Sequence, residues 1–168
     1  CLMKLFSKEA DIAIMYALPE DTAPDISRAF ETIDLGDDLL IPVCAPRLLA
    51  DASGAVIRII AYPADVFLGQ VMARMIRPRL PQGTTTIAIA ETALTLAMLQ
   101  LAVSEIGVAW LPMSLVEKAL AEGDLVRVDA ILPAQILNIK MVRLRALQTE
   151  QSEAIWQHLG RHLHVSSW

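Results

Sequence analysis

The sequence predicts an α/β fold in two lobes, with mixed, mostly parallel sheets and a cleft between the lobes. Two observations lead to this prediction. Short apolar runs alternate along the chain with segments of helical periodicity, which is the pattern of strands joined by helices. The hydrophobic fraction is 55% while aromatic residues make up only 5%, so the core is expected to be aliphatic, as in buried parallel strands.

Two groups of these elements meet near residues 45 and 145, and these junctions divide the expected lobes. Lobe I takes residues 1–45 together with 145–168, and lobe II takes residues 46–144. Ligands of open α/β sheets bind beyond the carboxyl ends of the strands. The cleft between the lobes is therefore the expected binding site.

Lobe I is predicted from five segments. They are a helix at 1–8, a strand at 11–16, a loop at 17–25, an apolar run at 39–46 and an amphipathic helix at 149–163. Pro42 cannot donate to a β-ladder, so the run that contains it is either an edge strand or a crossover between the lobes. Helical spacing places four side chains of the last helix inward, namely Ile155, Trp156, Leu159 and Leu163.

Lobe II is predicted to alternate strands with helices. The strands are expected at 55–62, 84–90, 107–111, 125–128 and 137–144, and the helices at 67–77, 92–104 and 114–123. Ser114 and Glu117 have the spacing of a capping box, and Gly123 has the position of a C-terminal glycine. The helix at 92–104 and the strand at 107–111 are almost wholly apolar, so both are expected to be buried on every side.

Charge and cysteine content exclude several classes of protein. The formal net charge of −5 opposes phosphate neutralisation, so this stretch alone is not expected to bind DNA. Cys1 and Cys44 have no CxxC partner, which indicates neither a disulfide framework nor a zinc site. No export signal, membrane-length apolar run or catalytic motif is visible, so we expect a non-enzymatic protein without a cofactor.

Three stretches resemble the effector-sensing part of LysR-type transcriptional regulators. "TALTLAMLQLAVSEIGVAWLPMSLVEKALAEGDLVRVD" has that family's succession of buried helix, tight turn, strand ending in Leu-Pro, short helix and "L-V-x-V". "SKEADIAIMY" is similar to the family's early strand, and "LGDDLLIPVCAPRLL" to its crossover into the second lobe. Glu105 stands where the family usually has glycine or a small residue, which is a departure at the turn.

The resemblance implies a periplasmic-binding-protein-like fold of type 2 and a regulatory function. A small-molecule effector, with carboxylates as one class, would bind between the lobes and shift the conformation or the oligomer of a DNA-binding protein. The resemblance further implies a cytoplasmic homodimer or tetramer that binds DNA only through a helix-turn-helix outside this sequence. The chain opens with Cys1 inside an expected helix, so we expect the first strand and helix of lobe I to be absent.

Thr92 and Glu91 are the first candidates for effector contact. Thr92 lies near the start of the helix at 92–104, where unpaired backbone N–H groups and the helix dipole favour a carboxylate. An N-cap role alone would equally explain this threonine. The neighbouring Glu91 would repel a carboxylate, which instead points to an amine-bearing ligand.

Five further residues are placed at the expected cleft by their positions at the ends of elements. Met15 and Tyr16 end the first strand, Val43 and Cys44 end the crossover, and Phe67 begins a helix for which Asp65 is a candidate cap. For Met15 a core position is the stronger interpretation. For Cys44 an inert buried thiol is the stronger interpretation, because no histidine or lysine adjoins it.

The remaining polar clusters have simple structural explanations. His158 and His162 have the i, i+4 spacing of metal ligands, but without a third ligand in register no metal site is predicted. Arg74, Arg77 and Arg79 suit an acidic partner, although a solvated helix end is the usual explanation of such a cluster.

Two alternatives to a small-molecule regulator remain open from the sequence. A solute-binding protein of a membrane transporter has the same bilobal architecture, and the start of this sequence does not exclude a preceding export signal. Seven methionines together with Cys44 allow an oxidant-sensing variant of the regulator.

Overall fold

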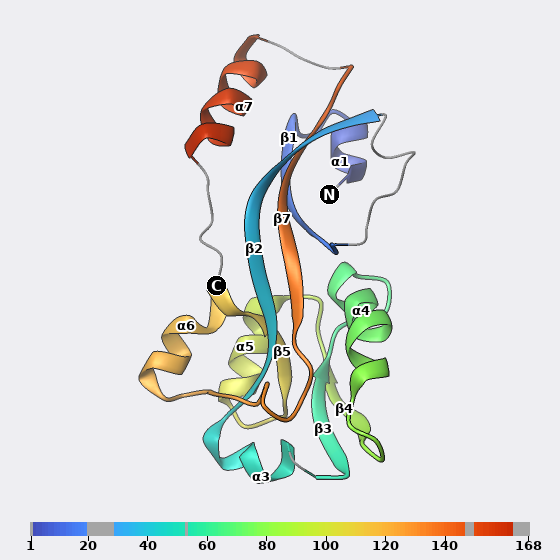
Figure 1. Ribbon diagram of the computed structural model, residues 1–168, viewed down its shortest axis with the longest axis vertical. Coiled ribbons are helices and arrows are strands. Elements are labelled where there is room, and N and C mark those ends of the chain that lie inside the picture. Colours follow the sequence, from blue (N-terminus) through green and yellow to red (C-terminus); the bar gives the residue numbers. More distant parts are fainter. Residues whose placement is uncertain (1, 20–28, 53, 147–149, 163–168) are drawn as a thin grey trace. The chain divides into compact units, whose positions relative to one another are not determined.

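The computed structural model describes residues 2–19, 29–52, 54–146 and 150–162 (Figure 1). The chain forms two compact units, of which unit 1 comprises Cys1–Asp38 and Ile136–Trp168 and unit 2 comprises Leu39–Gln135. The sequence placed the junctions near residues 45 and 145. The difference arises because two long strands, β2 (Phe30–Cys44) and β7 (Gln135–Leu144), each continue from one unit into the other.

The larger sheet has the strand order β1-β7-β2-β5, and β6 also pairs with β2. Its other strands are β1 (Ile12–Ala17), β5 (Ala109–Pro112) and β6 (Val126–Arg127). The expectation of mostly parallel sheets is wrong here, because β1 with β7, and β2 with β5 and β6, pair antiparallel. Alternation of strands and helices indicates a parallel arrangement only for strands that follow each other in the chain. It does not determine the relative direction of paired strands such as β1 and β7, which come from distant parts of the chain.

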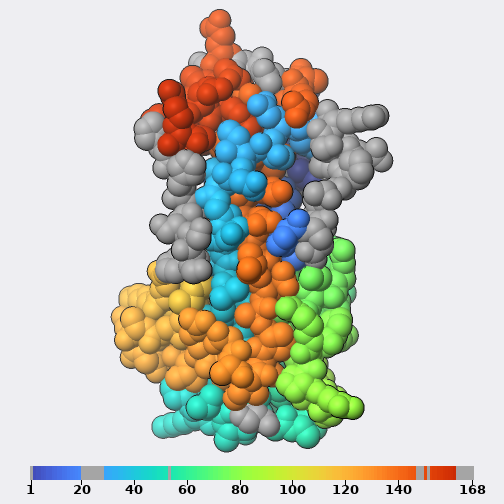
Figure 2. Space-filling model, in the orientation of Figure 1, coloured from blue at the N-terminus to red at the C-terminus, as the bar shows by residue number. Residues whose placement is uncertain are grey.

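β2 lies between other strands of this sheet, so its interpretation as an edge strand is wrong. The contacts of Asp37 with Asn138 and of Glu31 with Arg143 show that β2 and β7 run antiparallel. Figure 2 shows the two strands, blue and orange, side by side. By this register β7 has no residue at the level of Pro42, so the missing N–H of Pro42 removes no ladder bond to β7.

Unit 1 has a separate apolar cluster on each face of the sheet. Leu5 of α1 (Leu2–Phe6) packs with Phe30 and Val142. Trp156 of α7 (Glu150–His162) packs with Leu35 and Met141. Successive residues of a strand point to opposite faces, which explains why Met141 and Val142 belong to different clusters.

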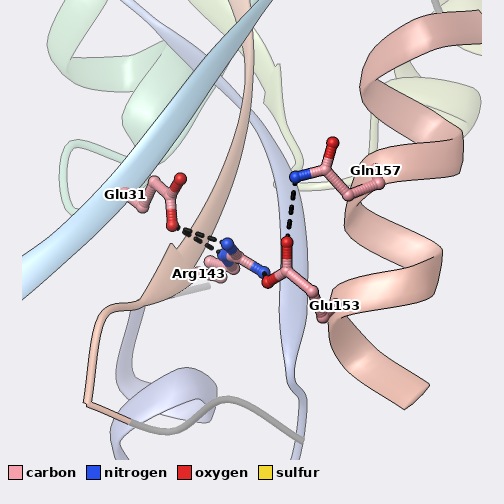
Figure 3. Close-up of polar contacts among 4 residues, drawn as sticks. All are labelled: Glu31, Arg143, Glu153 and Gln157. Atoms are coloured by element: carbon pink, nitrogen blue, oxygen red, sulfur yellow. Dashed lines mark hydrogen bonds and ion pairs between the residues drawn. The ribbon is translucent and has the colours of Figure 1, made fainter. Parts of the chain in front are cut away.

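α7 is attached to the sheet by an ion-pair network centred on Arg143 (Figure 3). This guanidinium, with a side chain only 5% exposed, donates Nε to Glu31 at 2.9 Å and Nη1 to Glu153 of α7 at 2.6 Å. It also lies over the Trp156 ring, 4.3 Å from its centroid. Hydrogen bonds from Gln157 and Arg143 hold the pKa of Glu153 below its usual value. The buried cation is thus compensated on both sides.

Inward packing of α7 is confirmed for Trp156 and wrong for Ile155, which is half exposed. Leu159 packs partly buried against the Trp156 cluster. Leu163 lies outside the described residues. A single large anchor together with the Arg143 network therefore docks this helix.

Unit 2 contains a second, two-stranded sheet. In it β3 (Val56–Ala61) pairs parallel with β4 (Thr85–Glu91), as the alternation of elements predicted. The helices of this unit are α3 (Leu49–Ala52), α4 (Phe67–Val71), α5 (Thr95–Val103) and α6 (Met113–Glu122). α5 contacts β5 and β3, and α6 contacts β5.

The predicted helix at 67–77 is only partly α-helical. After α4 the chain forms a π-turn at Met72–Ile76 and a 3-10 turn at Arg77–Arg79. Pro78 has no N–H and its ring clashes with the preceding turn, which prevents regular α-helix here. Gly69 allows close packing at the start, because a Cβ there would lie 1.9 Å from the carbonyl oxygen of Pro63.

α6 ends as predicted and begins differently. Gly123 adopts a φ of 79° and ends the helix in the left-handed conformation. The helix starts at Met113 with Pro112 as N-cap and without a side-chain cap hydrogen bond, so the capping box at Ser114 is wrong. Proline supplies a preset φ at this start.

The turn between α5 and β5 has a non-glycine residue with a positive φ. Glu105 has a φ of 62°, in the left-handed region that favours glycine. Its carboxylate lies 3.4 Å from the guanidinium of Arg47, and both groups are exposed.

The expected burial of the run 95–112 holds for the strand but not for the helix. All four residues of β5 are buried. In α5 only Met98 and Ala102 are fully covered, while Leu96 is 66% exposed. None of the helices in the described residues is long and apolar enough to cross a membrane.

Candidate functional site

The carboxyl edge of the β3–β4 sheet is the candidate site in unit 2. Ala61 and Glu91, the last residues of the two parallel strands, lie opposite each other in register. The backbone N–H of Thr92 donates to the carbonyl of Ala61 at 3.0 Å, which holds Thr92 beside the end of β3. The chain then enters α5 from one strand and approaches α4 from the other. Open α/β sheets bind ligands at this kind of edge.

Thr92 has a different local role from the one that capping predicted. Its Oγ1 accepts the backbone N–H of Leu94 at 3.1 Å, which is a side-chain turn before the helix. α5 begins at Thr95 with Leu94 as N-cap, so the N-cap interpretation of Thr92 is wrong. Since dipole effects are confined to the first turn, the helix contributes less to a ligand at Thr92 than expected. Glu91 beside it is exposed.

Phe67 begins α4 as predicted and is partly buried. The N-cap is Val66, and no side chain caps this helix, so the capping role of Asp65 is wrong. Phe67 follows β3 and Thr92 follows β4, so both come from the carboxyl side of the small sheet. Their contact with an effector stays a prediction.

Tyr16 and Met15 face opposite sides of the sheet in unit 1. Met15 packs partly buried against the cluster of Leu5, Phe30 and Val142. Tyr16 donates its hydroxyl proton to Oδ2 of Asp38, at 2.8 Å. Because strand neighbours alternate, only one of these two residues can belong to a site on a given face.

Val43 and Cys44 are fully buried at the end of β2, with exposures of 0%. Val43 lies opposite Ala109 of β5 and Arg127 of β6. Burial, reinforced by the charge of Asp51, raises the pKa of the Cys44 thiol to about 11. The thiol is therefore protonated at neutral pH, and an effector would touch either side chain only after local rearrangement.

Two polar clusters remain, and of these the structure gives a contact role to Arg79, while an acidic partner for the three arginines stays a prediction. No group of three or more acidic, histidine or cysteine side chains there is arranged to hold a metal ion, and the side chain of His162 lies outside that part of the chain. Arg79 donates to the carbonyl of Ala134 at 3.0 Å and to Oε1 of Gln135 at 2.8 Å. It thus holds the start of β7.

Sequence reasoning missed two acidic residues of β2. Asp38 accepts from Tyr16 and is 2% exposed, and Asp37 accepts Nδ2 of Asn138 at 2.6 Å. The signal was present as "LGDD" within an apolar surrounding, where a buried carboxylate requires a donor. The distant partners on β1 and β7 leave no trace in local spacing.

The two-unit α/β architecture with a parallel sheet in unit 2 can be compared with known families. A family model described as "LysR substrate binding domain" matches residues 1–164. The chain therefore belongs to the LysR substrate binding domain family. No curated protein matches it.

Solved structures of LysR-type regulators share this fold. Full-length HypT from Salmonella typhimurium, a hypochlorite-specific regulator, aligns with a TM-score of 0.81 and 18% identity, covering 97% of this chain and 55% of HypT. Full-length LysG from Corynebacterium glutamicum with the bound effector Arg aligns with a TM-score of 0.68 and 15% identity, covering 95% of this chain and 53% of LysG. The isolated regulatory domain of HypT gives a TM-score of 0.79 and 18% identity, over 97% of this chain and 78% of that domain.

These comparisons decide between the classes that the sequence left open. The family is one of transcription regulators and not of enzymes. The alternative of a transporter's solute-binding protein is wrong, since the matching family and its structural neighbours are regulators. The chain spans about half the length of the full-length regulators that it matches.

Proposed function

We propose that this chain senses a small-molecule effector for a longer protein that binds DNA through a segment outside this sequence. The parallel edge of β3 and β4, where Thr92 is bonded to Ala61, is the observation that carries the proposal. Thr92, Glu91 and Phe67 would supply contacts from unit 2, and Tyr16 from unit 1. Met15, on the other face of the sheet from Tyr16, and the fully buried Val43 and Cys44 would contact an effector only after local rearrangement. Regulation of transcription would place the protein in the cytoplasm.

The mechanism of this sensor is a population shift. An effector changes the balance between two conformations only by its differential affinity for them, and about 1.4 kcal/mol of difference changes that balance tenfold. Thr92 contributes an Oγ1 and a backbone position fixed by Ala61 and Leu94, so its side chain is already oriented. Glu91 adds a negative charge next to it, which disfavours carboxylate effectors.

The site is tested by titrating candidate effectors into this chain and into its Thr92→Val variant, which keeps the shape and loses the hydroxyl. Calorimetry should show binding to the parent chain that is weakened about tenfold in the variant, the loss expected for one hydrogen bond. Thr95→Val, at the first residue of α5, is the matched control. Equal affinity in the Thr92 variant, with an unchanged fold, would remove Thr92 from the site.

The DNA-binding part of the proposal has a separate test. Because the net charge of this chain is −5, it should not retard DNA at physiological salt, whereas the full-length protein should do so in an effector-dependent way. Retardation by this chain alone would overturn the assignment of DNA binding to a segment outside it.

A homodimer or tetramer is the proposed assembly, and a set of exposed apolar side chains in unit 2, here called the face, supports it. The face comprises Ile87 and Ile89 of β4 with Leu94 and Leu96 at the start of α5, each about half exposed or more. Among the described strands, β4 pairs only with β3, so its other edge is open. A second copy of the chain would cover both the apolar side chains and the open edge.

Sedimentation velocity tests the assembly. The double variant Leu94→Ser/Leu96→Ser should dissociate at concentrations at which the parent chain is associated. Ile155→Ser on α7, a similarly exposed side chain outside the face, is the control and should leave association unchanged. A monomeric parent chain up to high micromolar concentration would contradict this face as a dimer contact.

Burial argues against the thiol version of oxidant sensing. HypT is hypochlorite-specific, but Cys44 here is fully buried and its pKa is raised, so it lacks the exposed thiolate that oxidants attack.

A further inference from the structure

Residues 66–90 of unit 2 carry only positive charge in a chain that is acidic as a whole. This stretch contains three arginines, Arg74, Arg77 and Arg79, and neither aspartate nor glutamate, whereas the formal net charge of the chain is −5. All three arginines are exposed. Figure 2 shows this part of the chain, in green, on the surface of unit 2. A local excess of one charge attracts partners of the opposite charge.

The turns that follow α4 are held in place by Arg79. Its Nε donates to the carbonyl of Met75, and its Nη2 donates to Oε1 of Gln135 at 2.8 Å. Arg79 is therefore engaged within unit 2, and Arg74 and Arg77 are the cations left for a partner. Because the turn is already fixed, a partner that binds these two side chains has little backbone to order, which lowers the entropic cost of binding.

Arg74 and Arg77 differ from the other exposed arginines of unit 2. No hydrogen bond or ion pair involves either side chain within the part of the chain that the structure describes. Three other arginines are each paired with a carboxylate of the same unit at 3.4 Å or less, namely Arg47 with Glu105, Arg58 with Asp51 and Arg127 with Asp129. The unpaired guanidinium groups of unit 2 are thus concentrated in one turn.

We propose that Arg74 and Arg77 form a docking surface for an acidic segment of a partner protein. A guanidinium binds a carboxylate through two parallel hydrogen bonds, so aspartate and glutamate side chains fit this surface. Nucleic acid fits it less well, because two free cations neutralise few phosphates and the net charge of −5 opposes an extended polyanion. The docking surface uses none of the effector-site residues, so it stands independently of the proposed function.

Unit 2 offers a matched pair of double variants. Arg74→Gln/Arg77→Gln and Arg47→Gln/Arg58→Gln each remove two positive charges from exposed side chains of the same unit. Only the first variant removes guanidinium groups that have no carboxylate partner of their own. An effect of net charge therefore appears in both variants, whereas an effect of the docking surface appears only in the first.

The experiment measures fluorescence anisotropy of three labelled probes with this chain: a helical glutamate-rich peptide, its glutamine counterpart and a DNA duplex. At about 0.1 M salt, charges further than about 10 Å away are largely screened, so the probes respond to local charge. We expect the glutamate peptide to bind, the DNA to bind more weakly and the glutamine peptide not to bind. Arg74→Gln/Arg77→Gln should weaken binding of the glutamate peptide about tenfold, and Arg47→Gln/Arg58→Gln less than about twofold.

Four results would overturn the proposal. They are no binding of the glutamate peptide at millimolar concentration, equal binding of the glutamine peptide, equal weakening by the two double variants, and tighter binding of DNA than of the glutamate peptide through Arg74 and Arg77. The last result would make the turn a nucleic-acid contact. Circular dichroism checks that both double variants are folded, as expected for substitutions of exposed side chains.

Discussion

α5 and β5 are neighbours in sequence and equally apolar, but only one of them is covered by its own chain. β5 lies against β2, and its four residues are buried. α5 turns Met98 and Ala102 inward while Leu94 and Leu96, 70% and 66% exposed, face outward around its start. Apolar composition thus indicates that a surface will be covered, but it does not indicate whether the same molecule or a second one covers it.

The largest effect is expected on the buried side of this comparison, at Trp110 of β5. Its ring is 1% exposed and its Nε1 donates to the carbonyl of Pro133 at 2.8 Å. Trp110→Ala should lower the free energy of unfolding by about 3–5 kcal/mol through the cavity that it leaves. Urea denaturation measures this. Trp110→Phe, which keeps most of the volume and loses the donor, should cost about 1–2 kcal/mol. A loss below 1 kcal/mol for alanine would contradict the packing of β5.

Cys44, beside β5 on β2, should make stability depend on alkaline pH. Its pKa is raised from 9.0 to about 11 in the folded chain, so between these values the unfolded chain releases a proton that the folded chain keeps. The stabilisation is present below about pH 9 and is lost as pH rises to 11, by on the order of 2 kcal/mol. The contribution of Cys44 to the pH dependence of the free energy of unfolding is isolated by comparing the parent chain with Cys44→Ala, both carrying Cys1→Ser. Parallel pH profiles would refute it.

A smaller change in stability, this time an increase, is expected on substitution of Glu105, in the turn that joins α5 to β5. A non-glycine residue at a φ of 62° is strained, so Glu105→Gly should raise the free energy of unfolding by roughly 0.5–1 kcal/mol. The lost ion pair with Arg47 is exposed and contributes little. Glu105→Ala removes the same ion pair but keeps a Cβ, so it should show no gain. Equal stabilisation by alanine would assign the effect to charge and not to conformation.

The smallest effect on folding is expected at Leu96. Leu96→Ser should change the free energy of unfolding of the monomer by less than about 0.5 kcal/mol, because the side chain is already in water. Measurement at low chain concentration separates folding from association. A loss comparable to that of Trp110→Ala would mean that α5 is covered within one chain after all, and the contrast with β5 would disappear.

Most elements could be predicted from the sequence because their signals are local. The alternating run at 84–90 became β4, and Gly123 ended α6 with a positive φ. Sheet direction was predicted incorrectly, because β1 and β7 meet across more than a hundred residues of sequence. The first part of β2 was missed altogether. Its residues from Phe30 to Asp38 are rich in charge, and the strand is stabilised by partners such as Arg143 and Asn138.

The positions of the candidate site residues along the chain could be predicted from the sequence, but their hydrogen bonds could not. The positions of Thr92 and Phe67 after parallel strands follow from the order of elements. The Tyr16–Asp38 bond does not, because it requires knowledge of which face each strand turns to its neighbour. Caps were the least reliable predictions. Near Thr92, Asp65 and Ser114 the helices begin at other residues, and none of these three helices has a side-chain cap hydrogen bond.

The path of the chain through the two units has a practical meaning for protein engineering. Unit 2, Leu39–Gln135, is one uninterrupted stretch inserted into the sequence of unit 1. Its two ends continue into β2 and β7, which are neighbouring strands of the sheet. Asp37 and Asn138 flank the insertion points and are already in contact. A turn of a few residues joining Asp38 to Ile136 would therefore connect the two segments of unit 1 in a protein from which unit 2 is deleted. Unit 1 could in this way serve as a scaffold into which other domains are inserted in place of unit 2.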